Sequence, residues 1–187
     1  MDARELAALV RQPATRRFDP SRPVPAETVA AIVETARWTG SARNRQPWRF
    51  VEVRRRATLR ALAGLGAYAQ FVAEAPVALA VASAEDLGPN GPRADIEYDV
   101  GRVTQSLVLA AAALGLGCCP ATLFPAENVT AAARLLDLPP GWAPRHLLAL
   151  GHPAPREAGS AVRGVSAVPT GRRAVTELLT VLDDEVS

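Results

Sequence analysis

Arginine clusters at turns are the residues of this chain whose types and spacing could do chemistry. Guanidinium groups bind anions through paired hydrogen bonds, so clusters that converge in the fold would form an anion site, most simply for the phosphate of a nucleotide-like cofactor. Any one cluster by itself is more simply a solvated basic surface, and sequence spacing does not show convergence. The clusters are Arg11, Arg16 and Arg17, then Arg43, Arg45 and Arg49, then Arg172 and Arg173.

The stretch TGSARNRQPWRF, residues 39–50, has the densest group of hydrogen-bonding side chains. Its arginines stand beside Ser41, Asn44 and Gln46, between an apolar-striped segment and a Trp-led run of β-rich composition. Either these side chains face one ligand, or Asn44 and Gln46 cap the preceding helix and hold the loop in shape. The residues alone leave both interpretations open.

Other catalytic signatures are missing from the sequence, which has no G-x-G-x-x-G after a strand, no G-x-x-x-x-G-K-[ST] and no H-E-x-x-H. His146 and His152 stand neither beside a nucleophile nor at a metal-ligand spacing. We therefore expect structural roles for both, and neither a hydrolase triad nor a metal site. The adjacent Cys118 and Cys119 fit no disulfide, redox or zinc spacing, and we expect them to be small buried residues in a reducing compartment.

Composition bounds the class of protein. With 187 residues, 49% of them hydrophobic, and a formal net charge of +2, the chain suits one globular domain over residues 1–187. All 21 basic residues are Arg and are spread along the chain, which gives little reason to expect a nucleic-acid or membrane partner. The N-terminus lacks the pattern of a signal peptide. We therefore expect a cytoplasmic protein.

Hydrophobic periodicity predicts alternating helices and strands. Residues 24–38 have the i, i+3, i+4, i+7 spacing of an amphipathic helix that begins at Pro25 and ends near Gly40, and residues 48–53 have the composition of a strand. The expected order is helix, helix, strand, helix, strand, long helix, strand, helix, strand and tail, which is typical of an α+β domain with a sheet covered by helices. The later elements are expected at 57–72, 77–83, 95–114, 118–124, 125–138, 145–153 and 171–184.

The segment 95–114 is apolar on most sides. Such a helix is buried on most sides, either at the centre of a domain or at the seam of a dimer. The uncharged run 103–126 is long enough to span a membrane, but its polar residues, its glycines and Pro120 favour a buried helix, a turn and a strand. The apolar positions are Ile96, Val100, Val103, Leu107, Ala110 and Leu114, with Val108, Leu109 and Ala113 on the far side.

Four stretches resemble, in order, the nitroreductase family of FMN-dependent oxidoreductases. RRFDPSRPVPAETVAAIVETARWTGSARNRQPWRFVEV resembles the family's N-terminal signature: R-x-F, a P-V-P helix start, and S-x-x-N-x-Q-P-W running into a strand. YDVGRVTQSLVLAAAALGLGCCPATLFP is similar to its long central helix and the Pro-containing segment that follows. LLDLPPGWAPRHLLALGHPA and GRRAVTELL resemble its L-x-L-P-x-G-W…A-L-G-x-P element and its C-terminal basic turn.

The resemblance implies an α+β sandwich in which helices flank a central, mostly antiparallel sheet. It also implies an intimate homodimer with the long helix at the interface and two FMN sites built from both subunits. NADH or NADPH would reduce the flavin, and a small electron-poor acceptor such as a nitroaromatic or a quinone would reoxidise it in a ping-pong cycle. The flavin would supply the redox chemistry, so no side chain need act as a nucleophile.

The resemblance also implies cofactor-binding residues, by position. Arg16 matches the basic residue of R-x-F that contacts flavin, and Arg172, with Arg173 beside it, matches the tail arginine that holds the phosphate. The family's loop that lines the flavin ring and ribityl chain matches Ser41, Arg43, Asn44 and Gln46. The family's segment whose backbone runs against the isoalloxazine matches Pro120, Ala121, Thr122 and Leu123.

The chain departs from the family pattern at three places. The family's Arg-x-Ser before R-x-F corresponds to Gln12 and Ala14, so Arg11 or Thr15 would have to replace that phosphate ligand. Thr122 stands where well-known members have an acidic residue, and the region 84–95 is short for a lid. The alternatives are a flavin-binding or sequestering protein without turnover, a family member for cobalamin-ligand synthesis, dehalogenation or natural-product dehydrogenation, and a basic interaction module without cofactor.

Overall fold

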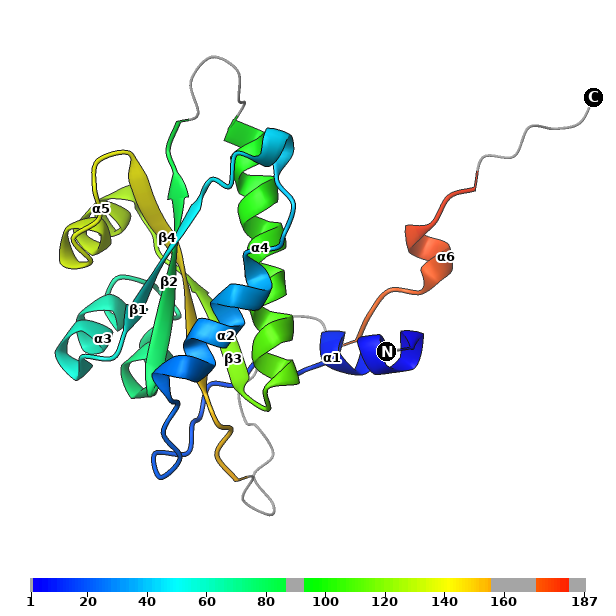
Figure 1. The fold of residues 1–187 in the computed structure, drawn as a ribbon, viewed down its shortest axis with the longest axis horizontal. Helices are drawn as coiled ribbons and strands as arrows, with labels where there is room; N and C mark the ends of the chain where they lie inside the picture. The colour runs from blue at the N-terminus through cyan, green and yellow to red at the C-terminus, as the bar shows by residue number, and fades with distance from the viewer. Residues whose placement is uncertain (1, 87–92, 156–170, 182–187) are drawn as a thin grey trace, which may run out of the picture. The chain divides into compact units, whose positions relative to one another are not determined.

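The computed structural model describes residues 2–86, 93–155 and 171–181 (Figure 1). They belong to two compact units, Met1–Pro155 and Arg156–Ser187. The second unit contains α6 (Val175–Leu178). The first unit contains α1 (Ala3–Val10), α2 (Ala26–Ala36), the 3₁₀ turn η1 (Ala42–Asn44), β1 (Trp48–Val53), α3 (Arg56–Ala63), the 3₁₀ turn η2 (Gln70–Glu74), β2 (Val77–Ala84), α4 (Arg93–Ala113), β3 (Gly117–Thr122), α5 (Ala126–Leu135) and β4 (Trp142–Gly151).

The strands form one sheet in the order β1-β2-β4-β3, and every described pair is antiparallel. β2 lies in the middle with β4, and all eight of its residues are buried, as its continuous apolar composition predicts. β1 and β3 are the outer strands of this sheet. The prediction of an α+β fold with an antiparallel sheet is confirmed.

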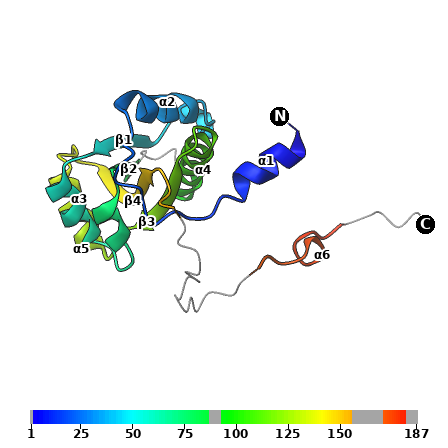
Figure 2. The same cartoon turned by 90° about the horizontal axis from the view of Figure 1, so that it is seen from below.

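Helices cover both faces of the sheet, and Figure 2 shows α2 and α4 on one side of the strands and α3 and α5 on the other. The alternation of side chains along a strand divides the core in the same way. Leu79 and Val81 of β2 pack with α2 and α4. Ala78 and Ala80 pack with α3 and α5, so small side chains let these two helices approach the sheet.

The predicted helix over 57–72 is wrong in its second half. α3 ends at Ala63, and Gly64 follows as its C-cap. The chain then turns through Gly66, where a Cβ would stand 2.9 Å from the Thr122 carbonyl oxygen. A residue with a side chain does not fit this close approach of two backbones, and the helical spacing beyond Gly64 belongs to the separate turn η2.

The long helix α4 packs one face against the core, through Ile96, Val100, Val103 and Leu107. Val108, expected on the far side, also packs against the chain's own core. Leu109 instead lines an open groove with a volume of about 460 Å³ between α1, the end of α2 and α4. In the part of the chain that the structure describes, no helix has the length and apolarity needed to cross a membrane.

A short segment, Thr15–Phe18, crosses the sheet where β3 begins and β4 ends. Thr15 N donates to the Cys118 carbonyl at 2.8 Å, and Phe18 forms a β-bridge with Pro153. Gly117 and Gly151 are directly opposite each other in the ladder. A Cβ at Gly117 would overlap the Thr15 side chain, and one at Gly151 would stand 2.6 Å from the Phe18 ring. Two glycines therefore allow this segment to dock on the sheet.

We expect Gly117→Ala to lower the free energy of unfolding by about 1–3 kcal/mol, because the new methyl group forces Thr15 away from β3. Gly101→Ala is the matched control, since nothing lies within 4 Å of a Cβ at that helical position. Alanine is favoured over glycine in a helix interior by roughly 0.5–1 kcal/mol, so this variant should be at least as stable as the wild type. Urea unfolding measures both, and an undiminished stability of Gly117→Ala would contradict the close approach.

Candidate functional site

The loop before β1 is held by one face of α4. The Asp99 carboxylate, in a residue only 2% exposed, accepts a hydrogen bond from Ala42 N at 2.8 Å. Arg45 forms an ion pair with Asp95 at 2.9 Å. A buried carboxylate must be hydrogen-bonded to be tolerated, so the position of the loop and the burial of Asp99 depend on each other.

Further along the same face, α4 also binds the residues that follow α2. Arg102 Nη1 donates to the Gly40 carbonyl at 2.7 Å, and Thr39 Oγ1 donates to Ser106 Oγ at 2.7 Å. Asp95, Asp99, Arg102 and Ser106 follow one another at helical spacings of four and three, so they form one polar stripe along α4. These helix residues were missed in the sequence, although polar side chains at that spacing on an otherwise apolar helix were a signal for them.

The loop backbone is unusual. Arg43, Asn44 and Gln46 have φ values of 53°, 54° and 49°, in the left-handed region that costs a residue with a side chain about 1–3 kcal/mol. Gln46 N donates to Ser41 Oγ at 2.8 Å, and Gln46 Nε2 donates to Asn44 Oδ1 at 3.1 Å. Thus Ser41, Asn44 and Gln46 bond to one another and hold this conformation together with α4.

The three arginines of the loop have different surroundings. Arg45 is tied to Asp95, and Arg49 lies over the Trp142 ring at 4.6 Å. Arg43 is exposed, and among the described residues its side chain has neither a hydrogen bond nor an ion pair. Of these three cations, Arg43 is therefore the one whose guanidinium is turned to solvent and available to a ligand.

Arg16 lies at the outer edge of β3. Its guanidinium stands 5.9 Å from the Phe71 ring centre and next to Cys119. Burial raises the pKa of the Cys119 thiol, while the charge and a hydrogen bond of Arg16 oppose that effect. Burial, with the neighbouring Cys119, also raises the pKa of Cys118 to about 11, so Cys118 is a thiol at neutral pH, as expected for a packed residue.

The segment Pro120–Leu123 combines an edge strand with a turn. Pro120 and Thr122 are exposed, whereas Ala121 and Leu123 are buried and anchor the segment. Leu123 N donates to the Arg145 carbonyl at 2.8 Å, which continues the pairing with β4 past the strand. The Thr122 hydroxyl stands 3.4 Å from His146 Nδ1. The side of this segment that carries Pro120 and Thr122 is therefore open, and Arg16 contacts the preceding residue, Cys119.

Arg16 and the loop do not come together in one chain. Pro47 O accepts from Ala84 N at the end of β2, whereas the Thr15–Phe18 segment docks at the end where β2 begins (Figure 1). At ~3.3 Å per residue, the eight residues of β2 place these ends roughly 23 Å apart. The sequence hypothesis that these two clusters meet around one anion therefore fails within a single copy.

The remaining candidate arginines, Arg11, Arg172 and Arg173, are exposed, and in the described part of the chain the only hydrogen bond of their side chains joins Arg172 to the backbone of its neighbour. Arg11 is the exposed C-cap of α1, and Gln12 Nε2 donates to Ala8 O at 3.3 Å. Arg172 and Arg173 are exposed residues of the second unit, and Arg172 Nη1 donates to the Gly171 carbonyl at 2.9 Å. Their roles stay predictions. Most of the region between 84 and 95, expected to be short for a lid, lies outside the described residues.

The two histidines differ in their contacts. His146 is half-buried on β4, and burial lowers its pKa, with Glu97 opposing and Arg145 adding to the effect. His152 Nδ1 is buried and has no hydrogen-bond partner among the described residues. In the same part of the chain, no group of three or more His, Cys, Asp and Glu residues could hold a metal ion.

Comparison with known proteins gives one consistent result. The sequence model described as "Nitroreductase family" matches residues 12–67 and 63–152. A protein named NADH dehydrogenase from Thermus thermophilus is 34% identical over 180 residues, covering 79% of this chain and 85% of its own length. A 5,6-dimethylbenzimidazole synthase from Rhodospirillum rubrum is 35% identical over 158 residues, covering 70% and 74%. A Desulfovibrio desulfuricans protein solved in complex with FMN has a TM-score of 0.74 at 26% identity, covering 98% and 99%.

We expect Asp99→Ala to lower the free energy of unfolding by about 1–3 kcal/mol, because the Ala42 N–H loses its acceptor inside the protein. The freed loop should also be cut faster by trypsin after Arg43. Asp95→Ala is the matched control: it removes a partly exposed ion pair, for which a loss of at most about 1 kcal/mol is expected. Limited proteolysis with mass spectrometry reports the cleavage site, and equal rates after Arg43 in the two variants would show that Asp99 does not hold the loop.

Proposed function

The chain belongs to the nitroreductase family, and from that premise we propose that it is an FMN-dependent oxidoreductase. It passes electrons from NADH or NADPH to a small electron-poor acceptor, such as a nitroaromatic or a quinone, by a ping-pong mechanism. The observation that carries the proposal is the strained loop that Asp99 holds against α4. A backbone held in a costly conformation at a matched family position is typical of a binding site.

The residues present fit a flavin mononucleotide. Arg16 and Arg43 are cations without a carboxylate partner among the described residues, as an anionic cofactor requires. The outer strand β3 offers an edge of polar backbone near Arg16, which contacts Cys119, the residue before Pro120. The hydroxyl and amide groups of Ser41, Asn44 and Gln46 suit the ribityl chain and the edge of the flavin ring. Arg172 and Arg173 are the further candidates for the phosphate.

Bound FMN would supply the redox chemistry, taking electrons from the nicotinamide and handing them to the acceptor. The protein's part is electrostatics and position. The Arg16 guanidinium would stabilise the negative charge of the reduced cofactor, and backbone N–H groups of the Pro120–Leu123 segment that are not bonded to β4 would add fixed dipoles. The loop residues orient the ring, and their attachment to α4 keeps that orientation without reorganisation during turnover.

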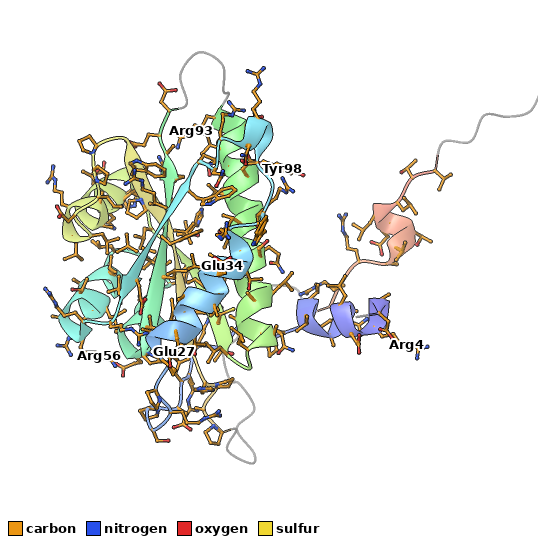
Figure 3. All side chains as sticks on the ribbon, in the orientation of Figure 1. Arg4, Glu27, Glu34, Arg56, Arg93 and Tyr98 are labelled. Carbon is orange, nitrogen blue, oxygen red and sulfur yellow. The ribbon has the colours of Figure 1, made fainter. Side chains whose placement is uncertain are left out.

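The site is completed by a second copy of the chain. Because the loop and Arg16 lie roughly 23 Å apart in one copy, one flavin contacts both only when the loop comes from a partner. An apolar surface suits such a partner: Leu6, Leu9, Trp38, Leu109 and Ala113 line the groove beside α4. Figure 3 shows Tyr98 projecting from the same helix away from the sheet, and its side chain is 69% exposed. We propose a homodimer with α4 at its interface.

A specific similarity favours one second candidate. A relative at 35% identity is named 5,6-dimethylbenzimidazole synthase. The same site could then consume its flavin rather than recycle it. Formation of 5,6-dimethylbenzimidazole from FMN in the presence of NADH and air, followed by chromatography, would identify this activity.

The purified protein, with FMN added if needed, should have a flavin absorption spectrum that bleaches when NADH or NADPH is added without oxygen. Colour should return when a quinone or a nitroaromatic is then added, because the flavin passes its electrons on. Anaerobic spectrophotometry measures both steps. Flavin that binds but is reduced by neither nicotinamide would favour the flavin-sequestering alternative, and a protein that binds no FMN would overturn the proposal.

Arg16→Ala is expected to weaken FMN binding about tenfold or more, because a cation beside the cofactor is lost. Arg60→Ala is the matched control: Arg60 is exposed on α3, and among the described residues its side chain has no hydrogen bond, ion pair or ring contact. Fluorescence titration with FMN measures both dissociation constants. Equal affinity in the two variants would remove Arg16 from the site.

Leu109→Asp is expected to convert the dimer to single chains and to release FMN, because a charge would be buried in the interface. Leu135→Asp is the matched control, since Leu135 is an exposed leucine on α5, away from the groove. Sedimentation velocity reports the mass of each species, and absorption at the flavin band reports its FMN content. A monomeric variant that keeps its flavin would show that one copy is sufficient.

A further inference from the structure

Thr122 and His146 form a polar pair on the face of the sheet that α4 covers. They are directly opposite each other in the β3–β4 ladder. His146 lies on the same face of β4 as Leu148, two residues further along, and Leu148 packs in the core under α4. The Thr122 Oγ1 and His146 Nδ1 atoms are 3.4 Å apart. Thr122 is exposed and His146 is half-buried behind it. A ligand at the edge of β3 would therefore meet the hydroxyl first and the imidazole only through it.

A β-bulge brings His146 to this position. Along the β2–β4 ladder, Val81 pairs with His146, but Ser83 pairs with Ala143, so β4 has one residue more than β2 between these pairs. Bulges re-aim side chains and are common beside active sites. In this sheet the irregularity begins at His146, the residue that is paired with Thr122.

The surroundings of His146 determine its charge. Burial lowers the pKa of the imidazole, the Glu97 carboxylate on α4 opposes this effect, and the neighbouring Arg145 on β4 adds to it. Glu97 also pairs with Arg93 at 3.6 Å. On β2 the residue facing His146 is the apolar Val81. The described groups thus leave the imidazole neutral at neutral pH and charged when the pH falls.

The charge of the imidazole determines which way the Thr122 hydroxyl points. A neutral imidazole with its proton on Nε2 accepts the hydroxyl hydrogen at Nδ1, which leaves only oxygen lone pairs for the ligand. A charged imidazole donates from Nδ1 to the hydroxyl oxygen, so the hydroxyl hydrogen must turn outwards. Protonation therefore changes the hydroxyl from an acceptor to a donor on its exposed side.

We propose that His146 is a positioning residue that sets the direction of the Thr122 hydroxyl beside the bound flavin and so makes the flavin easier to reduce when the imidazole is charged. This inference rests on the proposed function, which places FMN at the edge of β3. A hydroxyl that donates towards the flavin stabilises the electron-rich reduced form more than the oxidised form. By reciprocal linkage, reduction of the flavin favours protonation of His146.

The sign of the pH dependence follows. Burial has lowered the pKa of His146. At a pH below this pKa, the Thr122 hydroxyl donates towards the flavin, and the midpoint potential rises by more than the flavin's own uptake of protons would raise it. Above this pKa, the hydroxyl is turned to His146 and this extra increment is lost. If the reduced form gains a tenfold advantage, the increment is about 30 mV for a two-electron couple.

The midpoint potential of the FMN-loaded protein, measured by spectroelectrochemistry from about pH 5 to 8, tests the inference. The wild type should have the extra increment at low pH. His146→Gln should lose it, and so should Thr122→Val, which keeps the shape of the side chain and removes the hydroxyl. His152→Gln, a change at the chain's other histidine, should keep it.

The outcomes separate this inference from the proposed function. An increment that survives in Thr122→Val or His146→Gln, or that is missing from the wild type while FMN binds and is reduced, would overturn the inference alone. A wild-type protein that binds no FMN would overturn both. Because Thr122 is exposed, Thr122→Val gives a decisive result even where His146→Gln folds poorly.

Discussion

The burial of the Asp99 carboxylate is the constraint on which the candidate site depends. A charge in so enclosed a position is stable only with donors at hand, and the nearest is the backbone N–H of Ala42 in the loop before β1. Arg102 adds a cation at 3.8 Å and also holds Gly40. The packing of α4 therefore depends on the loop, because release of the loop would leave the Asp99 carboxylate without the Ala42 N–H. Three left-handed residues persist in the loop because α4 and the hydrogen bonds within the loop hold them.

A second constraint lies at the other end of the sheet. Gly117 and Gly151, opposite each other in the ladder, let the Thr15–Phe18 segment lie directly on the strands, and this places Arg16 beside β3. Each end thus carries part of the candidate site, and packing fixes the position of both parts. The length of β2 separates the two parts, so the proposed cofactor site needs two copies of the chain.

Between these ends, the exposed edge of β3 combines rigidity with a titratable group. Ala121 and Leu123 are buried and hold the strand, so the groups that alternate with them, Pro120 and Thr122, face outwards in a defined orientation. His146 stands behind Thr122 on the next strand. A hydroxyl whose hydrogen follows the charge of an imidazole is a small structural difference, yet in the proposed site it would act beside the flavin. Packing, polarity and reactivity are therefore connected through one pair of opposed residues.

The sequence by itself determined the element types and their order, because 3.6-residue and two-residue periodicities are local; the run Trp48–Val53 is a strand as expected. It also identified the loop, Arg16 and the Pro120 segment through their resemblance to a family. Only the tertiary structure decided that the predicted helix 57–72 stops at Ala63 and that Asp99 holds Ala42 from 57 residues away. It also decided that Arg49 stacks on Trp142, while Arg43 has neither a hydrogen bond nor an ion pair among the described residues. Close approaches and buried charges join distant parts of the chain, and no local pattern records which parts will meet.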